Sequence, residues 1–250
     1  MHVLILGGTR DAMNLAAALL HDPRFEATYS LAGRTRRPLP SGLPTRRGGF
    51  GGIAGLVQWL QDHGAAAVVD ATHPFAAQMS ANAVAACRMT GLPLLRLGRP
   101  AWTPVDGDHW YDVPDLDAAA VRLGEVTEPG QNVLLTTGGT TLRHFESMAG
   151  LHFVVRCVDP PEPPPAFASW TLITDRGPFD LAGEQALLSR YGIDIVVTKN
   201  SGGPAAQPKL DAARHAGLSV IMVERPELPS ADRELYSVED VIANLEALRG

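Results

Sequence analysis

Short apolar stretches alternate with helical patterns along the whole chain, and this alternation is the feature that most limits the possible folds. Several of these stretches, such as Val3–Leu6 and Ala67–Asp70, are apolar at nearly every position rather than at every second one. Continuous apolar runs are typical of parallel strands that helices cover on both faces. The sequence therefore predicts a doubly wound α/β fold with mostly parallel sheets.

The expected strands and helices follow from these runs and from helical periodicity. Helical periodicity also follows the first apolar run directly, after Gly-Gly-Thr. The strands are expected at Val3–Leu6, Ala27–Leu31, Ala67–Asp70, Leu94–Leu97, Val133–Thr136, Phe153–Cys157, Thr171–Thr174, Ile195–Thr198 and Val220–Val223. The other helices are expected near Ile53–His63, Ala76–Met89, Leu116–Leu123, Leu181–Arg190, Ala205–His215 and Val238–Leu248.

The chain has 250 residues, which allows two domains of about 100–150 residues each. The stretch Leu97–Trp110 interrupts the alternation with prolines and glycines, so we place a boundary there, with domains at 1–99 and 100–250. The proline-rich stretch Asp159–Phe167 is expected to be a stiff connection inside the second domain.

Charge and cysteine content exclude several classes of protein. A net charge of −6 argues against nucleic acid and membrane surfaces as partners. Cys87 and Cys157 lie far apart, which argues against a disulfide framework or a cysteine zinc site. Met1 leads directly into the first expected strand, and no apolar run reaches about 18 residues. We expect a soluble cytoplasmic protein, either a monomer or a small homo-oligomer.

The loop after the first strand has the spacing of a dinucleotide-binding fingerprint. Gly7, Thr9 and Ala12 occupy the positions of G-x-G-x-x-G/A, with Thr9 in place of the middle glycine. Gly7 and Gly8 permit a tight turn, and the amides that open the next helix can face a pyrophosphate, with Arg10 beside them. A purely structural strand-to-helix turn is the alternative.

The second strand indicates which dinucleotide would bind. An NAD site usually has an acidic residue near this strand's end, but none occurs between Ala27 and Pro40. Arginines follow the strand instead, and guanidinium groups can clamp a 2′-phosphate. The residues concerned are Gly33, Arg34, Arg36, Arg37, Arg46 and Arg47. This pattern favours NADPH over NADH, and a solvated basic loop is the alternative.

The third expected strand ends in Asp70, which Thr72 and His73 soon follow. Their position predicts contact with the nicotinamide half of the cofactor. Pro74 restricts His73 to extended geometry, so a structural cap is the alternative for that histidine. No second histidine or cysteine lies at ligand spacing, which argues against a metal role.

The second half has two similar loops, which carry Thr137 and Gly138 in one and Lys199 and Ser201 in the other. Lysine and hydroxyl groups near a helix N-terminus suit carboxylate or phosphate groups, so these residues are candidates for substrate binding, and structural turns are the alternative. Asp175 ends another strand and could donate a proton or cap a helix. Nucleophile-elbow and Walker motifs are absent from the sequence, so catalysis is expected to depend on positioning two ligands.

Five sequence pieces occur in order between about Val3 and Pro226. They are ILGGTRDAMNLA, DATHPFAAQMSANA, TTGG, RGPF and TKNSGG…KLDAAR…G followed by VERP. This ordered set resembles the precorrin-6A reductases of cobalamin biosynthesis. Asn200 stands where an acidic residue is expected, and Gly183 and Glu184 depart from the pattern after Gly-Pro-Phe.

The resemblance implies two Rossmann-like domains and NADPH-dependent reduction of a corrin-precursor tetrapyrrole. A hydride would pass to a ring carbon and a proton to its neighbour, with His73, Asp175 or water as the proton donor. The macrocycle's many carboxylates would be held by arginine, lysine and backbone amides. Two other functions stay open: a non-catalytic dinucleotide-binding regulator, and a two-domain transferase that uses a sugar nucleotide.

Overall fold

The computed structural model describes residues 1–33 and 35–249. The chain forms two compact units, and it passes from one to the other twice. Unit 1 comprises Met1–Pro100 together with the residues from Glu227 onward, and unit 2 comprises Ala101–Pro226. Each unit contains one six-stranded sheet in which every strand pair is parallel.

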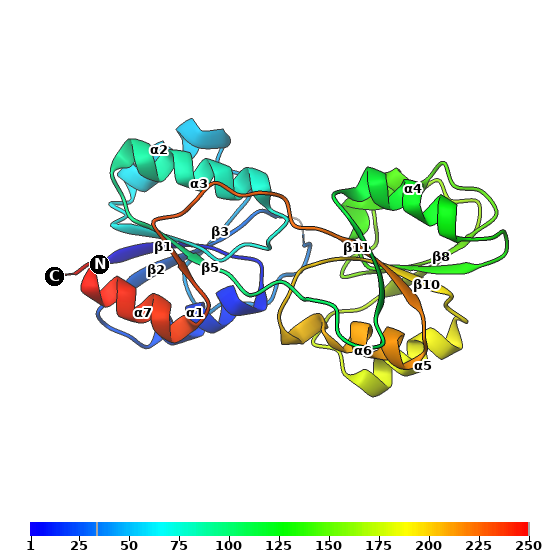
Figure 1. Ribbon diagram of the computed structural model, residues 1–250. Coiled ribbons are helices and arrows are strands. Elements are labelled where there is room, and N and C mark those ends of the chain that lie inside the picture. Colours follow the sequence, from blue (N-terminus) through cyan, green and yellow to red (C-terminus); the bar gives the residue numbers. More distant parts are fainter. Residues whose placement is uncertain (34, 250) are drawn as a thin grey trace. The chain divides into compact units, whose positions relative to one another are not determined.

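The strands of unit 1 lie in the order β3-β2-β1-β4-β5-β12. They are β1 (His2–Leu6), β2 (Glu26–Leu31), β3 (Thr45–Arg47), β4 (Ala67–Asp70), β5 (Leu94–Leu97) and β12 (Arg233–Leu235). Figure 1 shows α1 (Arg10–Leu20) and α7 (Val238–Ala247) on one face, and α2 (Gly52–Asp62) and α3 (Ala77–Thr90) on the other. This is the doubly wound order, and its direction reverses between β1 and β4.

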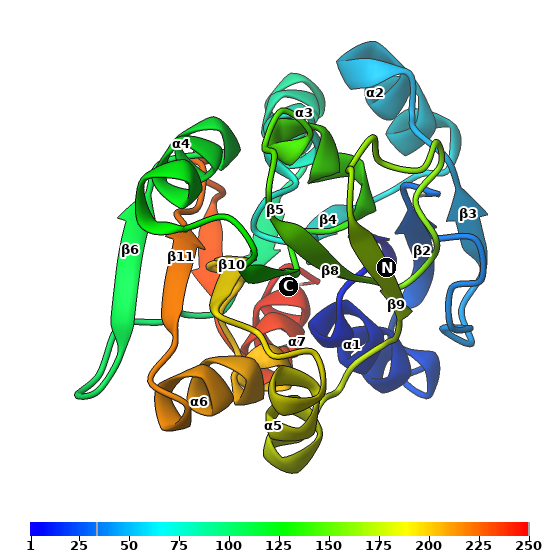
Figure 2. The ribbon, with the colours of Figure 1, turned by 90° about the vertical axis from the view of Figure 1, so that its right-hand side faces the viewer.

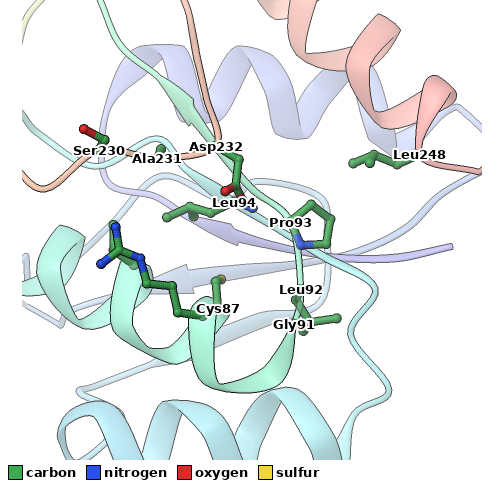
Figure 3. Close-up of a pocket in the computed structure, with 11 residues that line it drawn as sticks. Cys87, Gly91, Leu92, Pro93, Leu94, Ser230, Ala231, Asp232 and Leu248 are labelled. Carbon is green, nitrogen blue, oxygen red and sulfur yellow. Dashed lines mark hydrogen bonds between the residues drawn. The ribbon is translucent and has the colours of Figure 1, made fainter.

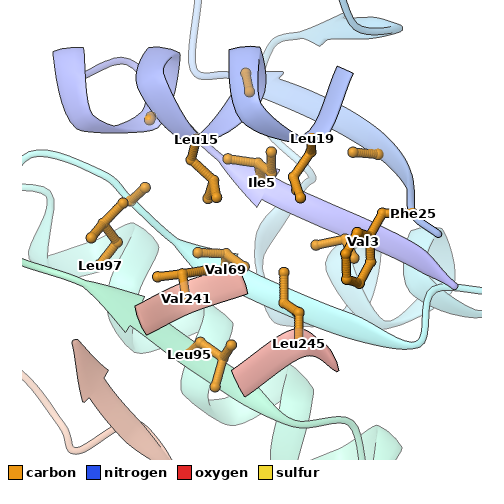
Figure 4. Close-up of a cluster of buried hydrophobic side chains, with 14 of the residues drawn as sticks. Val3, Ile5, Leu15, Leu19, Phe25, Val69, Leu95, Leu97, Val241 and Leu245 are labelled. Atoms are coloured by element: carbon orange, nitrogen blue, oxygen red, sulfur yellow. The ribbon is translucent and has the colours of Figure 1, made fainter. Parts of the chain in front are cut away.

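The continuous apolar strands of unit 1 are explained by cores on both faces of the sheet. Val3 and Ile5 of β1 pack with the helices α1 and α7 (Figure 4), whereas Leu4 and Leu6 belong to the cluster formed with α2 and α3. All four side chains are at most 1% exposed. Because both faces are covered, the strand shows no alternation of apolar and polar residues.

The strands of unit 2 lie in the order β6-β11-β10-β7-β8-β9. They are β6 (His109–Val113), β7 (Asn132–Leu135), β8 (His152–Cys157), β9 (Trp170–Thr174), β10 (Ile195–Lys199) and β11 (Ser219–Val223). In Figures 1 and 2, α4 (Leu116–Val126) covers one face, while α5 (Leu181–Arg190) and α6 (Pro208–His215) cover the other.

The two sheets have the same strand order, which confirms the predicted fold class. Strands β9-β8-β7-β10-β11 of unit 2 correspond to β3-β2-β1-β4-β5 of unit 1. The sixth position differs in origin, since β6 begins unit 2 whereas β12 comes from the C-terminal part of the chain. In unit 2 the direction reverses between β7 and β10.

The predicted second domain, 100–250, is wrong in its last part, because the residues from Glu227 onward belong to unit 1. Val241 and Leu245 of α7 are fully buried in the same cluster as α1. A hydrogen bond of 2.7 Å from the Leu94 amide to an Asp232 carboxylate oxygen fixes the returning segment beside β5. The N- and C-terminal ends of the chain therefore both lie in unit 1.

All nine predicted strands are confirmed to within one residue at each end, and three further strands were missed. The missed strands, β3, β6 and β12, are short or largely polar, and each contains exposed residues. The helix expected at Ala205–His215 is divided into a 3-10 turn, η2 (Pro204–Ala206), and α6, because Pro208 cannot continue a helix from the preceding turn. Within the described part of the chain, no helix is both long and apolar enough to cross a membrane.

Candidate functional site

The Gly7–Gly8 turn between β1 and α1 packs closely against β2. A Cβ atom on Gly7 would lie 2.3 Å from the Tyr29 ring, and Gly8 has a φ of +110°, which favours glycine. The Gly7 amide donates to the Ser30 carbonyl at 2.9 Å, and the Gly8 amide donates to the Tyr29 hydroxyl at 3.0 Å. These two glycines therefore shape the loop, and their amides are already used within the fold.

The amides available to an anion come from the first turn of α1 instead. Thr9 caps the helix, and its hydroxyl accepts from the Ala12 amide at 3.1 Å. Among the described residues, no hydrogen bond is found for the amides of Thr9, Arg10 and Asp11. Unpaired amides at a helix N-terminus form a site for a phosphate or carboxylate.

Asp11 places a negative charge in that first turn, where it would repel a phosphate. Its carboxylate pairs with Arg99 at 2.5 Å, and the Arg99 side chain is only 19% exposed. The arginine compensates the charge, so the helix end remains suitable for an anion.

The loop after β4 is built around Asp70. This side chain is 2% exposed, and its Oδ1 accepts from the Thr72 hydroxyl at 2.6 Å and from the Thr72 amide at 3.1 Å. Its Oδ2 faces Nε of Arg96 at 3.4 Å. Asp70 was expected to contact the cofactor, but its carboxylate is turned into the fold, where it holds Thr72 in place.

His73 follows on the surface of the same loop. Its Nδ1 accepts from the Phe75 amide at 3.2 Å, and the two rings lie 5.7 Å apart. With Nδ1 as acceptor, a neutral imidazole carries its proton on Nε2. In this neutral form the Nε2–H group of His73 can donate a hydrogen bond, whereas donation of a proton requires the imidazolium form.

The structure brings the loops after β1 and β4 together. These strands are neighbours, with Leu6 paired to Asp70, and the Thr9 hydroxyl donates to the Ala71 carbonyl at 2.8 Å. The loops thus meet where the strand order reverses, which is the usual position of a ligand in doubly wound sheets.

The loops after β2 and β3 also lie against each other. The Gly48 amide donates to the Leu31 carbonyl at 2.9 Å, and a Cβ on Gly33 would lie 3.7 Å from the Gly48 nitrogen. Arg47 ends β3 and is exposed. Gly33 therefore lies against Gly48, the residue that follows Arg47, and Arg34 lies outside the described residues.

Unit 2 repeats this arrangement at its own reversal point. The strands β7 and β10 pair, and the Thr136 amide donates to the Val197 carbonyl at 3.0 Å. The predicted substrate-binding residues lie at the carboxyl ends of these two strands: Thr137 and Gly138 follow β7, Lys199 ends β10, and Ser201 follows it. The predicted substrate group is therefore gathered at one edge of one sheet.

The contacts of Asn200 explain why an amide stands at the position where an acidic residue was expected. Its Oδ1 accepts from the Trp102 amide at 2.8 Å, and its Nδ2 donates to the Trp102 carbonyl at 2.9 Å. The indole of Trp102 also donates to the Gly203 carbonyl at 3.1 Å. A carboxylate could accept but could not donate, so this clamp requires an amide. Sequence reasoning missed Trp102, because nothing local links it to a residue 98 positions away.

Asp175 does not join this group. It follows β9 at the edge of the sheet, and β7 is separated from β9 by β8. Neighbouring strands are about 4.8 Å apart, so Asp175 lies roughly 10 Å from the β7 edge. Its exposed carboxylate accepts from the Arg176 amide at 2.7 Å.

A buried charged cluster lies on the α5 and α6 face of unit 2. Arg156 of β8 pairs with Glu184 of α5 at 2.8 Å, with side chains 6% and 1% exposed. Lys209 of α6 is 6% exposed, and burial together with the nearby Arg156 lowers its pKa to about 7, against the opposing effect of Glu184. Oε2 of Glu184 is also buried, and no hydrogen-bond partner for it occurs among the described residues.

A comparison with known families fits this geometry. The family model described as "Precorrin-6x reductase CbiJ/CobK" matches residues 2–246. The chain belongs to this family.

Relatives in the precorrin-6x reductase family match nearly end to end. The precorrin-6A reductase of Rhodobacter capsulatus is 46% identical over 99% of this chain and 94% of its own length. That of Rhodococcus erythropolis is 46% identical over 96% of each chain. A solved structure titled "CobK precorrin-6A reductase" matches with a TM-score of 0.92 at 45% identity, covering 99% of this chain and 97% of that one. The chain is therefore an oxidoreductase of the precorrin-6x reductase family.

Reduction by this family is consistent with a nicotinamide cofactor, and unit 1 fits a dinucleotide in three respects. The first turn of α1 offers unpaired amides, Arg99 neutralises the acid beside them, and the sequence has no carboxylate between Glu26 and Asp62. A diphosphate and a 2′-phosphate each require such a positive, hydrogen-bonding environment.

The cavity in Figure 3 lies away from these loops. It has a volume of about 340 Å³ and is lined by the end of α3, the start of β5 and the segment around Asp232. The start of β5 is the opposite end of the strand from the reversal point, so this cavity is not the candidate cofactor site. Burial raises the pKa of Cys87 in its wall to about 12, which leaves that thiol unreactive. The described residues contain no cluster of metal-ligating side chains.

Proposed function

We propose that the protein catalyses the NADPH-dependent reduction of precorrin-6A, in which a hydride passes to a ring carbon and a proton to its neighbour. Two neighbouring features of unit 1 carry this proposal. The first turn of α1 has amides without a hydrogen-bond partner among the described residues, and the stretch between Glu26 and Asp62, which contains β3, carries arginines but no acidic residue. Family membership favours this reaction over a regulator without turnover and over a sugar-nucleotide transferase.

Unit 1 would hold the cofactor from its pyrophosphate to its adenosine end. The amides of Thr9 and Arg10 would bind the pyrophosphate, with Gly7 and Gly8 keeping the turn tight. Gly33, Arg34 and Arg47 would surround the 2′-phosphate. NADPH supplies the hydride when it is bound, while the protein fixes its orientation.

The loop after β4 would lie beside the nicotinamide. Asp70 orients Thr72 through two hydrogen bonds, so the threonine hydroxyl has a fixed position. His73 is the candidate proton donor that we favour, because it lies exposed on the loop after β4, where an imidazolium could give its proton to the reduced ring and return to the neutral form. Asp175 and water remain alternatives for this step.

Unit 2 would bind the carboxylates of the macrocycle. Thr137 and Gly138 would contribute hydroxyl and amide groups, while Lys199 and Ser201 would contribute a cation and a second hydroxyl. Charge-assisted hydrogen bonds of this kind suit a polyanionic substrate. The Asn200–Trp102 clamp would keep the second of these loops in one conformation.

The test combines turnover with cofactor preference. Purified protein given precorrin-6A and NADPH should lose absorbance near about 340 nm, the reduced nicotinamide band. Calorimetry should give tight binding of NADPH and no binding of a sugar nucleotide. Binding of NADPH without turnover would support the regulator instead.

Cofactor preference tests the arginine edge. Arg34→Ala and Arg47→Ala should each weaken NADPH binding by about 1–3 kcal/mol and leave NADH binding nearly unchanged, since only NADPH carries the 2′-phosphate. Arg122→Ala, on the exposed surface of α4, serves as a charge-matched control. Equal losses for both dinucleotides would exclude the proposed phosphate contact.

A further inference from the structure

Arg46 is the most constrained side chain at the edge formed by β2 and β3. It pairs in register with Ser30, and its Nη1 donates to the Ser30 hydroxyl at 2.9 Å. Nη1 also donates to the Gly48 carbonyl at 2.9 Å, and Nη2 donates to the Gly49 carbonyl at 3.0 Å. These bonds fix the plane of the guanidinium against the loop that follows β3.

One face of that plane is covered. The guanidinium carbon lies 3.6 Å from the centroid of the Phe50 ring, which is a stacking distance. Guanidinium hydrogen bonds lie in the plane of the group, so the three acceptors occupy its edges and leave its faces free of them. The Arg46 side chain nevertheless stays partly exposed. We infer that the exposed part of the side chain is the guanidinium face opposite Phe50.

The surroundings of Arg46 are open. A Cβ added to Gly48 or to Gly51 would meet no atom within 4 Å, and both residues have positive φ angles. Gly48 lies beside Gly33, the residue that follows β2 by two positions. In doubly wound folds the adenosine part of a dinucleotide lies beyond the end of this strand.

We propose that the face of the Arg46 guanidinium opposite Phe50 is the platform on which the adenine ring of the cofactor stacks. This inference rests on the proposed function and names a residue for the base rather than for the phosphates. Three of the five N–H groups of Arg46 already serve the protein, so its role differs from the phosphate clamp assigned to Arg34 and Arg47. Stacking does not depend on the 2′-phosphate, so it should serve NADPH and NADH equally.

Arg46→Lys tests the platform, because it keeps the charge and removes the plane. Calorimetry compares NADPH, NADH, adenosine 2′,5′-bisphosphate and ribose 2,5-bisphosphate, the last of which lacks the base. The variant should weaken the three adenine ligands by a common factor of about five to thirty, which corresponds to roughly 1–2 kcal/mol of stacking. Binding of ribose 2,5-bisphosphate should not change, although a collapsed loop would weaken it as well.

Two controls separate this role from those of its neighbours. Arg47→Ala should weaken NADPH and both bisphosphates and spare NADH, which is the opposite pattern. Phe50→Leu removes the ring behind the guanidinium and keeps its hydrogen bonds, so it should show the Arg46→Lys pattern with a smaller factor. Thermal unfolding of each variant reports whether unit 1 is folded.

The outcomes distinguish the platform from the proposed function. If the wild type binds no dinucleotide, both proposals fail. If it binds NADPH but Arg46→Lys leaves NADH affinity unchanged, only the platform is refuted. The wild type gives a further test that needs no variant: adenosine 2′,5′-bisphosphate should bind more than about fivefold more tightly than ribose 2,5-bisphosphate. A ratio near one would overturn the platform even if the Arg46 variant failed to fold.

Discussion

The buried pair of Arg156 and Glu184 in unit 2 leads to a quantitative prediction about stability. Their side chains are 6% and 1% exposed, and Lys209 lies beside them with its side chain also buried. Glu184 is thus a single carboxylate serving two cationic groups inside the unit. Glu184→Gln keeps the size of the side chain and removes the charge that compensates Arg156.

Removing one partner of a buried ion pair costs about 3–5 kcal/mol, because the other charge stays buried without compensation. Glu184 also raises the pKa of Lys209, so in the variant that lysine loses its proton more readily and does not add a second uncompensated charge. The expected cost is therefore that of Arg156 alone. For a unit of this size it corresponds to a fall in melting temperature of roughly 10–20 °C.

Differential scanning calorimetry and urea unfolding measure this change. Glu125→Gln is the matched control, because its pair with Arg122 on α4 is 54% and 43% exposed, and it should change stability by less than about 0.5 kcal/mol. The double variant Arg156→Met/Glu184→Gln should lose much less than the sum of its single variants. A loss below about 1 kcal/mol for Glu184→Gln, or additive losses in the cycle, would refute the reasoning.

Three further predictions concern single side chains. Between pH 7 and 10.5, Lys209 is deprotonated in the folded protein and protonated in the unfolded chain, so the stability of the wild type should rise with pH. Lys209→Met should abolish this rise, and urea unfolding across the same pH range measures it. Asn200→Asp loses the bond to the Trp102 carbonyl and should destabilise unit 2 by about 1–3 kcal/mol, so an unchanged urea midpoint would contradict the clamp. Gly7→Ala would place a Cβ 2.3 Å from the Tyr29 ring, so thermal unfolding should show a loss of stability of about 1–3 kcal/mol. Wild-type stability in this variant would contradict the close packing of the turn against Tyr29.

Much of the fold could be predicted because its pattern is local. Strands such as Ala67–Asp70 and Leu94–Leu97 are short apolar runs, and the structure has the same bounds. The strand β12 was missed because Arg233–Leu235 has no apolar run of its own and becomes a strand only by pairing with β5. The domain assignment of α7 failed for a related reason, since an amphipathic helix does not specify which sheet it covers.

The sequence indicated where the candidate loops begin, but it did not indicate the directions in which their side chains point. Thr9 and Thr137 lie at the reversal points of their sheets, as expected from the end of a strand. Asp70, however, turns inward to Thr72 and Arg96, and this depends on a partner 26 residues away. Arg46 attracted notice only as part of a basic stretch, and its stacking on Phe50 could not be seen without the loop conformation.

The sequence by itself determined the alternation of strands and helices, the glycine turns and the absence of acidic residues after β2, because these depend on neighbouring residues and composition. Only the tertiary structure decided which amides are already paired, that Lys209 is buried, and which unit takes the last strand and helix. The physical reason is that burial and hydrogen-bond partners arise from contacts between distant segments, and such contacts leave no periodic signal in the chain.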